Sequence, residues 1–282
     1  METITNSNSI IDTKIIHLSS RGDSGNILNG EYKSVIQYDI PDGIVNDDTI
    51  EYIYWSIPYC IIPNSFYIIN ENNNTLVITI NSITTNYYFE YGNYSANSFI
   101  KQFNLIIPST FIITLDSLNS KFTITNTTYD FIFELSTIDY IIGFTGSISS
   151  IDKSITFSRC CNFLPLPRVN ICCSQLSNFT LMASKNDISN IILSVPNNGK
   201  LNGQIIYNNI SQIQTLFKND RLDNFIISLT NDDGDPINFN GISFYMSLQF
   251  DICRKQLIKP LNFKKIVNLI NNKTLEQNEN NI

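Results

Sequence analysis

The stretch SIPYCIIPNSFYIIN, residues 56–70, is apolar enough for a protein core, yet Pro58, Pro63 and the polar pair after Pro63 interrupt it. A helix that spans a membrane needs about 20 apolar residues without breakers, so this stretch is not a span. Each proline lacks the backbone N–H that a β-sheet ladder requires, which excludes one continuous central strand. Because aromatic and β-branched residues flank the interruption, the stretch predicts a strand, a bend and a second strand.

Similar short strands recur along the chain at intervals of about ten residues, which is the spacing of an antiparallel sandwich or barrel. We predict strands at 14–18, 32–40, 49–59, 65–70, 76–80, 86–91, 110–115, 122–126, 131–135, 154–157, 169–173, 179–183, 190–195, 203–208, 225–229 and 242–250. Their alternating pattern predicts that the interior includes Trp55, Ile57, Phe66, Ile68, Phe225, Ile227, Phe244 and Leu248.

Helical patterns are sparse. Ser95 can cap a helix over 96–105, because Phe99 and Phe103 fall on one face at helical spacing. A shorter helix is predicted at 136–142, ending at Gly143, and a weaker pattern covers 261–270. The chain is therefore predicted to be mainly β.

The composition indicates a globular chain with a weakly charged surface. The 282 residues are 43% hydrophobic and only 15% charged, against about 25% charged residues in an average soluble domain. Such a surface repels its own copies weakly, which suits a component of an assembly. A net charge of −7 argues against direct nucleic-acid binding. Residues 1–8 lack the basic and apolar regions of a secretory signal, so we expect synthesis in the cytosol.

Six cysteines invite a metal interpretation, because four of them form the vicinal pairs Cys160–Cys161 and Cys172–Cys173. In a strand, however, neighbouring side chains point to opposite faces, so these four sulfurs do not converge easily on one tetrahedral zinc. We expect buried free thiols at Cys60, Cys253 and the two pairs. No metal and no cofactor are expected.

The single histidine, His17, removes most catalytic templates, since serine and cysteine nucleophiles usually need a histidine base. A dyad of a cysteine with His17 is the remaining catalytic arrangement, and a structural histidine is favoured over it. No glycine-rich phosphate-binding motif is present. The sequence predicts that the chain is not an enzyme and has no catalytic residues.

One acidic stretch resembles the start of a calcium loop. Asn231, Asp233 and Asp235 alternate as calcium ligands do, but Pro236 stands where that loop needs glycine, and no closing glutamate follows. We interpret 231–236 as a turn between two strands.

Four segments in order resemble one viral family. They are IHLSSR at 16–21, IPNSFYIIN at 62–70, GNYS at 92–95, which opens the predicted helix, and IGF at 142–144. Together they are similar to the penton (vertex) capsid proteins of virophages, polinton-like viruses and related large double-stranded DNA viruses. The similarity is best in the N-terminal half, and beyond residue 162 only the strand, turn and strand from 225 to 250 resemble that family.

The resemblance implies an all-β fold, an antiparallel jelly-roll sandwich with insertions and one or two short helices. It implies a structural protein of the virion that forms a homo-pentamer at the five-fold vertices of an icosahedral capsid, beside a double jelly-roll major capsid protein and possibly minor capsid proteins. We expect particle assembly in the host cytoplasm. An eight-stranded core leaves about a hundred residues over. The expected domains are an arm at 1–12, a jelly roll at 13–255 with an insertion or second β subdomain around 145–214, and a tail at 256–282.

Arg21, Gly22 and Asp23 spell a tripeptide that some animal-virus vertex proteins display to integrins. A tripeptide arises easily by chance, and Arg21 already belongs to the IHLSSR segment. We therefore expect Arg21 to contact its own subunit or an adjoining capsid protein, with no receptor role for Asp23.

Two other functions remain open. A minor or cement capsid protein of the same virus class would share all these features. A β-sandwich carbohydrate-binding protein is the alternative from a different class, and it would need aromatic and Asn or Asp side chains that converge in one concave site.

Overall fold

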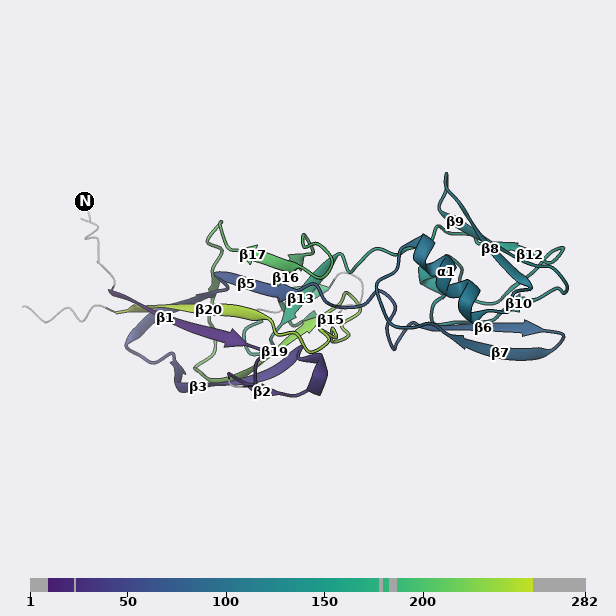
Figure 1. The fold of residues 1–282 in the computed structure, drawn as a ribbon. Coiled ribbons are helices and arrows are strands. Elements are labelled where there is room, and N and C mark those ends of the chain that lie inside the picture. The colour runs from purple at the N-terminus through teal and green to yellow at the C-terminus, as the bar shows by residue number, and fades with distance from the viewer. Residues whose placement is uncertain (1–9, 23, 178–179, 183–186, 256–282) are drawn as a thin grey trace, which may run out of the picture.

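The computed structural model describes residues 10–22, 24–177, 180–182 and 187–255. Over these residues the chain consists of antiparallel β-strands, with two short α-helices and one 3-10 turn at Gly30–Tyr32. The strands form two lobes, each with its own hydrophobic core (Figure 1). The predicted all-β fold is confirmed. The weak helical pattern at 261–270 lies outside the described residues.

The larger lobe is a sandwich, and its first sheet brings the first and last strands together. The strands of this sheet are β1 (Ile10–Ser19), β4 (Ile50–Ser56), β5 (Tyr59–Pro63), β17 (Gln204–Asn208), β18 (Thr215–Leu216) and β20 (Tyr245–Arg254). β20 pairs along its whole length with β1 on one side, and with β5 and β4 in succession on the other. β4 and β5 therefore act as one strand, broken only at Ile57 and Pro58. In the same way β17 and β18 pair with β5 and β4.

The second sheet of the sandwich has the order β16-β13-β19-β3-β2. Its strands are β2 (Asn26–Ile27), β3 (Val35–Val45), β13 (Arg168–Cys172), β16 (Ile191–Pro196) and β19 (Arg221–Thr230). The hairpin of β14 (Thr180–Met182) and β15 (Asp187–Ser189) lies between β13 and β16 in the chain. β3 and β19 shift register between Leu222 and Asn224, which marks a bulge in their ladder.

The strand order of the two sheets is that of a jelly roll. With β4–β5 and β17–β18 each taken as one strand, and with β2 and the β14–β15 hairpin set aside, eight strands remain. In chain order, one sheet runs 1-8-3-6 and the other runs 2-7-4-5. This arrangement of two Greek keys occurs in viral capsid domains, in lectins and in cupins. The predicted jelly-roll sandwich is thus confirmed.

The inner faces of the two sheets form the first core. Of the eight side chains predicted to be interior, seven are buried there: Trp55, Ile57, Phe66, Phe225, Ile227, Phe244 and Leu248. Ile68 is half-buried and packs in the other lobe. The chain therefore crosses from one core to the other at Tyr67.

The smaller lobe is inserted between β5 and β13 (Figure 1, right). It contains a four-stranded sheet of order β11-β10-β6-β7, a three-stranded sheet of order β12-β9-β8, and two helices. The bounds are β6 (Thr75–Ile80), β7 (Ile83–Tyr88), α1 (Ala96–Ile106), β8 (Phe111–Asp116), β9 (Lys121–Asn126), β10 (Ile132–Phe133), α2 (Asp139–Ile142), β11 (Ile148–Ser149) and β12 (Ser154–Thr156). We call this lobe the inserted domain.

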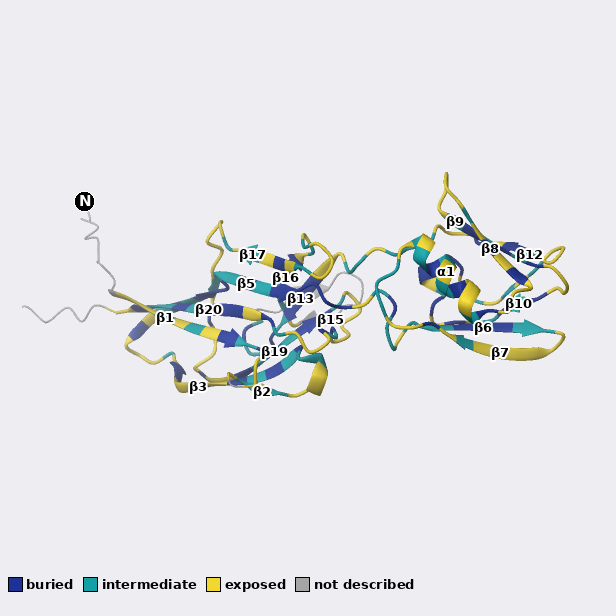
Figure 2. Ribbon diagram, in the orientation of Figure 1, coloured by how far each residue is buried: buried dark blue, intermediate teal, exposed yellow. Residues whose placement is uncertain are grey.

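Phenylalanine rings fill the core of the inserted domain, and Figure 2 shows buried and exposed residues along α1. Ser95 caps α1 as predicted, because its hydroxyl accepts a hydrogen bond from the Ser98 N–H, and Phe99 and Phe103 are the buried residues of the helix. The shorter predicted helix is the single turn α2, which ends at Gly143 as expected. Gly143 has φ 102°, and a Cβ there would lie 2.5 Å from the Arg159 carbonyl oxygen. Glycine is required at this position.

Two features differ from the sequence predictions. Residues 65–70 are not a strand, because the Ile68 N–H donates to the Asn93 side chain and Ile69 makes only an isolated bridge with Gly92. The second difference is the position of the extra residues, which we expected around 145–214. The second core is built from residues between Ile68 and Phe163. The other predicted strands within the described residues fall on observed strands, with ends shifted by a few residues.

The two segments that join the lobes are held together by Asn197. Its side-chain N–H donates to the Leu166 carbonyl at 2.9 Å, and its backbone N–H donates to the Pro167 carbonyl at 2.8 Å. Its Oδ1 accepts from the Asn64 amide at 3.4 Å. Asn64 is buried and also donates to the Gly199 carbonyl at 3.0 Å. Both crossings therefore leave the sandwich at one place.

Candidate functional site

The outward face of the six-stranded sheet is unusually poor in charge. Along each strand the side chains alternate between the core and solvent, and registers across the sheet align the outward ones. We call the following set the outer sheet face: Ile11, Thr13, Ile15, His17, Tyr52, Tyr54, Tyr59, Ile61, Gln204, Ile206, Asn208, Tyr245, Ser247, Gln249 and Asp251. Asp251 is the one acidic residue of this set, and the set holds no lysine or arginine. Several of its isoleucines are about half exposed.

Several polar groups of the outer sheet face have hydrogen-bond partners on the face or beside it. His17 Nδ1 lies 2.9 Å from the Ser247 hydroxyl and 3.5 Å from the Tyr59 hydroxyl. Asp251 accepts hydrogen bonds from Thr13 at 2.7 Å and from Gln214 at 2.6 Å. Because Thr13, Gln214 and Gln249 donate to the Asp251 carboxylate, it keeps hydrogen-bond partners when a neighbouring protein covers the face.

His17 has a structural environment. Its neighbours are hydroxyls, and Cys60 of β5, a strand that pairs with β20 and not with β1, points into the core on the opposite face of the sheet. None of the hydrogen bonds of His17 within the described residues involves a cysteine. A dyad of His17 with Cys60 is therefore excluded.

The described cysteines are all free thiols, and three of them are buried. Burial raises the pKa of Cys60 to about 12 and that of Cys173 to about 11. Thiols held in the protonated form are poor nucleophiles. Cys160 is the exposed one. Within the described residues no group of three or more His, Cys, Asp or Glu side chains is placed to hold a metal ion.

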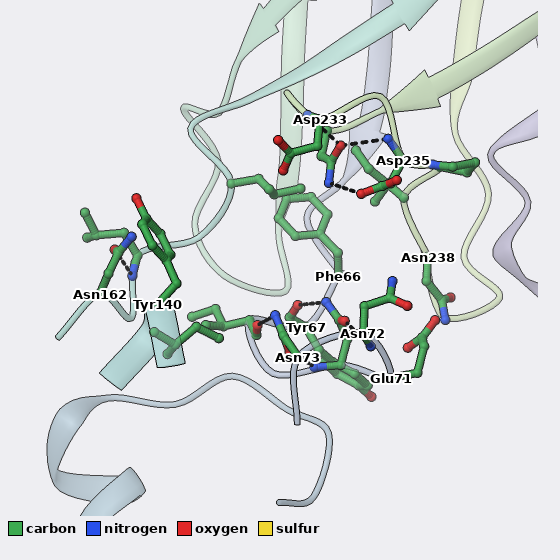
Figure 3. Close-up of a pocket in the computed structure, with 18 of the residues that line it drawn as sticks. Phe66, Tyr67, Glu71, Asn72, Asn73, Tyr140, Asn162, Asp233, Asp235 and Asn238 are labelled. Carbon is green, nitrogen blue, oxygen red and sulfur yellow. Dashed lines mark hydrogen bonds between the residues drawn. The ribbon is translucent and has the colours of Figure 1, made fainter. Parts of the chain in front are cut away.

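A groove of about 290 Å³ lies where the inserted domain meets the sandwich (Figure 3). One wall is the turn after β19, with Asp233 and Asp235, and the other is the start of α2 with Tyr140. The segment after the crossing at Tyr67 forms the floor. The remaining lining residues are Phe66, Ile68, Asn70, Glu71, Asn72, Asn73, Ile141, Asn162, Leu164, Leu166, Asn231, Pro236, Ile237, Asn238 and Asn240. The lining thus contains many amides, three carboxylates and no lysine or arginine.

Glu71 ties the floor of the groove to the sandwich. Its carboxylate accepts hydrogen bonds from the Tyr32 hydroxyl and from the Asn238 side chain. Burial by itself would raise the pKa of Glu71, but these hydrogen bonds outweigh it, and the pKa lies below its ordinary value. The same hydrogen bond raises the pKa of Tyr32. The hydrogen bonds of the Glu71 carboxylate therefore join the two lobes.

The acidic stretch at 231–236 is a turn, as predicted. The Asn231 side-chain oxygen accepts from the backbone N–H groups of Asp233, at 2.9 Å, and Asp235, at 2.8 Å. A calcium ligand would need that oxygen free, so the amide closes the turn instead of holding an ion. Asp233, in this turn, lines the groove (Figure 3).

Arg21 is exposed at the end of β1 and lines a hollow at the edge of the outer sheet face, beside Ile61 and Tyr245. Its carbonyl accepts from the Ser24 N–H at 3.1 Å, which closes a turn. Asp23 lies outside the described residues. The expected contact of Arg21 with its own subunit or a neighbour stays a prediction.

Sequence patterns did not indicate the groove. Its residues come from four separate parts of the chain, which are turns, irregular segments and the short helix α2. The abundance of Asn and Tyr in the composition was the only signal, and it did not locate a site.

The topology and the outer sheet face define a jelly-roll protein with an inserted domain. No helix among the described residues is long and apolar enough to cross a membrane. Neither the known protein-family models nor the curated proteins include a match to this chain. Among solved structures, the crystal structure of the selenomethionine-labelled mavirus penton protein is similar, with 13% identity, coverage of 87% of this chain and 100% of that chain, and a TM-score of 0.41.

Proposed function

We propose that this chain is a structural capsid protein that forms pentamers at the five-fold vertices of an icosahedral virion. The observation that carries the proposal is the outer sheet face of the jelly roll, which exposes isoleucines and tyrosines among side chains that are polar but almost all uncharged. Half-exposed isoleucines on one sheet face, with a single carboxylate among them, favour a face that an assembly covers.

Closed rings also need two different faces on each subunit, because every copy contacts its two neighbours through unlike surfaces. The outer sheet face supplies one of them. The inserted domain leaves the sandwich at a single place, beside Asn197, so it does not cover the sheets. The sandwich is thus free to pack side by side with other capsid proteins.

The four segments that resemble penton proteins all lie at contacts that determine this fold. Ser20, after β1, is buried and bonds the Phe244 backbone in both directions. The Asn93 side chain accepts from Ile68 at the crossing between the lobes. Ser95 caps α1, and Gly143 ends α2. Because these segments shape junctions of the fold, their joint order supports a shared architecture.

In this proposal the partners are further copies of the chain, a double jelly-roll major capsid protein and minor capsid proteins, and the location is the virion, assembled in the host cytoplasm. The chain has no catalytic role. The domain scheme of this proposal is an arm at 1–12, a jelly roll at 13–255 and a tail at 256–282. The inserted domain lies between β5 and β13 of the jelly roll.

Electron microscopy of purified particles tests the proposal. We expect five copies of the chain at each vertex. A location only beneath or between the hexagonal capsomers would instead identify the chain as a minor capsid protein.

A matched pair of variants tests the role of the outer sheet face. Ile206→Asp places a charge on this face and should reduce incorporation into particles at least about tenfold, since a buried unpaired charge is strongly unfavourable. Ile83→Asp places the same charge on an exposed isoleucine of β7 in the inserted domain and should leave incorporation unchanged. Equal incorporation of the two variants would refute the assignment of this face.

A further inference from the structure

We infer that the groove between the inserted domain and the sandwich is a binding site for a small neutral saccharide. The inference does not depend on the capsid assignment, since it rests on the groove residues alone. Its volume of about 290 Å³ lies near the lower end of the range for ligand sites, which suits a mono- or disaccharide.

Aromatic platforms are the first requirement of such a site, because the C–H face of a sugar ring packs against an aromatic ring. Two tyrosines in the groove are exposed, Tyr67 on the floor and Tyr140 on the wall of the inserted domain. In Figure 3 Tyr140 stands beside Asn162 at one side of the groove. An exposed aromatic ring next to an amide offers one sugar residue both an apolar and a polar contact.

Polar groups that both donate and accept are the second requirement, since each sugar hydroxyl also does both. An amide supplies a donor and an acceptor within one side chain. The Asn72 side chain has no hydrogen bond within the described residues, and the Asn162 amide uses only its oxygen, which accepts from the Leu164 N–H at 3.2 Å. Both amides therefore retain hydrogen-bonding capacity toward the groove.

The carboxylates decide which saccharides fit. Glu71 is occupied by Tyr32 and Asn238, and Asp235 accepts from the Asn231 amide at 3.3 Å. No described residue donates a hydrogen bond to the Asp233 carboxylate, so it can accept from sugar hydroxyls. Because no lysine or arginine lines the groove, a sialylated or sulfated sugar would meet like charge without a cation to offset it. One open carboxylate among several amides favours a polyhydroxyl ligand over an amine.

Titration of the full chain by ligand-observed NMR tests the inference. The neutral probes are galactose, glucose, mannose and N-acetylglucosamine, the anionic probe is N-acetylneuraminic acid, and the cationic probe is putrescine. We expect at least one neutral sugar to bind with a Kd of about 1 mM, which corresponds to about −4 kcal/mol. Neither charged probe should compete with it.

Three variants localise the binding. Tyr140→Ala and Asp233→Ala should each weaken binding at least about tenfold, whereas Tyr88→Ala, which removes an exposed tyrosine from β7, should not. The fluorescence of Trp55, which is buried in the sandwich core, reports that the sandwich of each variant is folded, and amide hydrogen exchange of α1 reports the same for the inserted domain. Absence of binding by all neutral sugars, preference for either charged probe, or unchanged binding by Tyr140→Ala and Asp233→Ala would overturn the inference. Particle incorporation is measured separately, so the two proposals fail independently.

Discussion

Replacement of Phe99 by alanine should destabilise the inserted domain without weakening the sandwich. Phe99 is fully buried, and its ring centroid lies 4.8 Å from that of Phe89, 5.3 Å from that of Phe163 and 5.7 Å from that of Phe122. Removal of a buried phenylalanine ring costs about 3–5 kcal/mol, because it leaves a cavity and forfeits the aromatic contacts. The sandwich core contains none of these rings, so it should keep its stability.

The chain carries its own reporter for this experiment, since its single tryptophan, Trp55, lies in the sandwich core. In urea, tryptophan fluorescence should give the same midpoint for the wild type and for Phe99→Ala. Amide hydrogen exchange of α1 should show the loss of stability of the inserted domain. A loss of about 4 kcal/mol, with a urea slope of about 2 kcal/mol/M, lowers the urea midpoint by about 2 M. The control is Phe225→Ala in the sandwich core, which should move the fluorescence midpoint.

The result that would refute this reasoning is a common shift. If Phe99→Ala lowered the fluorescence midpoint as much as Phe225→Ala does, the two cores would unfold as one cooperative unit, and the separation into two domains would have no energetic meaning.

Two further predictions follow from local geometry and burial. Gly143→Ala should destabilise the inserted domain by more than the roughly 1–2 kcal/mol of the left-handed conformation alone, since the new Cβ would also meet the Arg159 carbonyl, and unchanged exchange rates in α1 would contradict it. In labelling with iodoacetamide at neutral pH, Cys160 should react, whereas Cys60 should react only after the chain unfolds, because burial raises the Cys60 pKa to about 12. Modification of Cys60 in the folded chain, mapped by mass spectrometry, would contradict this prediction and show that the core opens.

Local patterns were sufficient to predict most of the strands and the longer helix. Alternation placed Trp55 and Phe225 in the core, and Ser95 with Phe99 and Phe103 identified α1. These signals succeed because burial and capping act over a few residues, and the same residues satisfy them in the fold.

The crossing between the lobes could not be predicted in this way. Residues 65–70 have the composition of a strand, but their backbone bonds to asparagine side chains, such as Asn93 and Asn73, replace a neighbouring strand. The groove was also hidden, because Tyr140 and Asp233 become neighbours only when the inserted domain meets the sandwich. Contacts between domains do not produce a periodic pattern of residues in the sequence.

Asn197 forms hydrogen bonds to both segments that join the lobes, and this has an evolutionary consequence. Since the inserted domain leaves and rejoins the sandwich within reach of one side chain, its gain or loss changes only the length of one loop of the jelly roll. The free energy of a fold depends only slowly on loop length, and positions of this kind tolerate whole inserted modules. A lineage can therefore exchange this module by recombination, together with whatever it binds, while the sandwich that carries it is inherited unchanged.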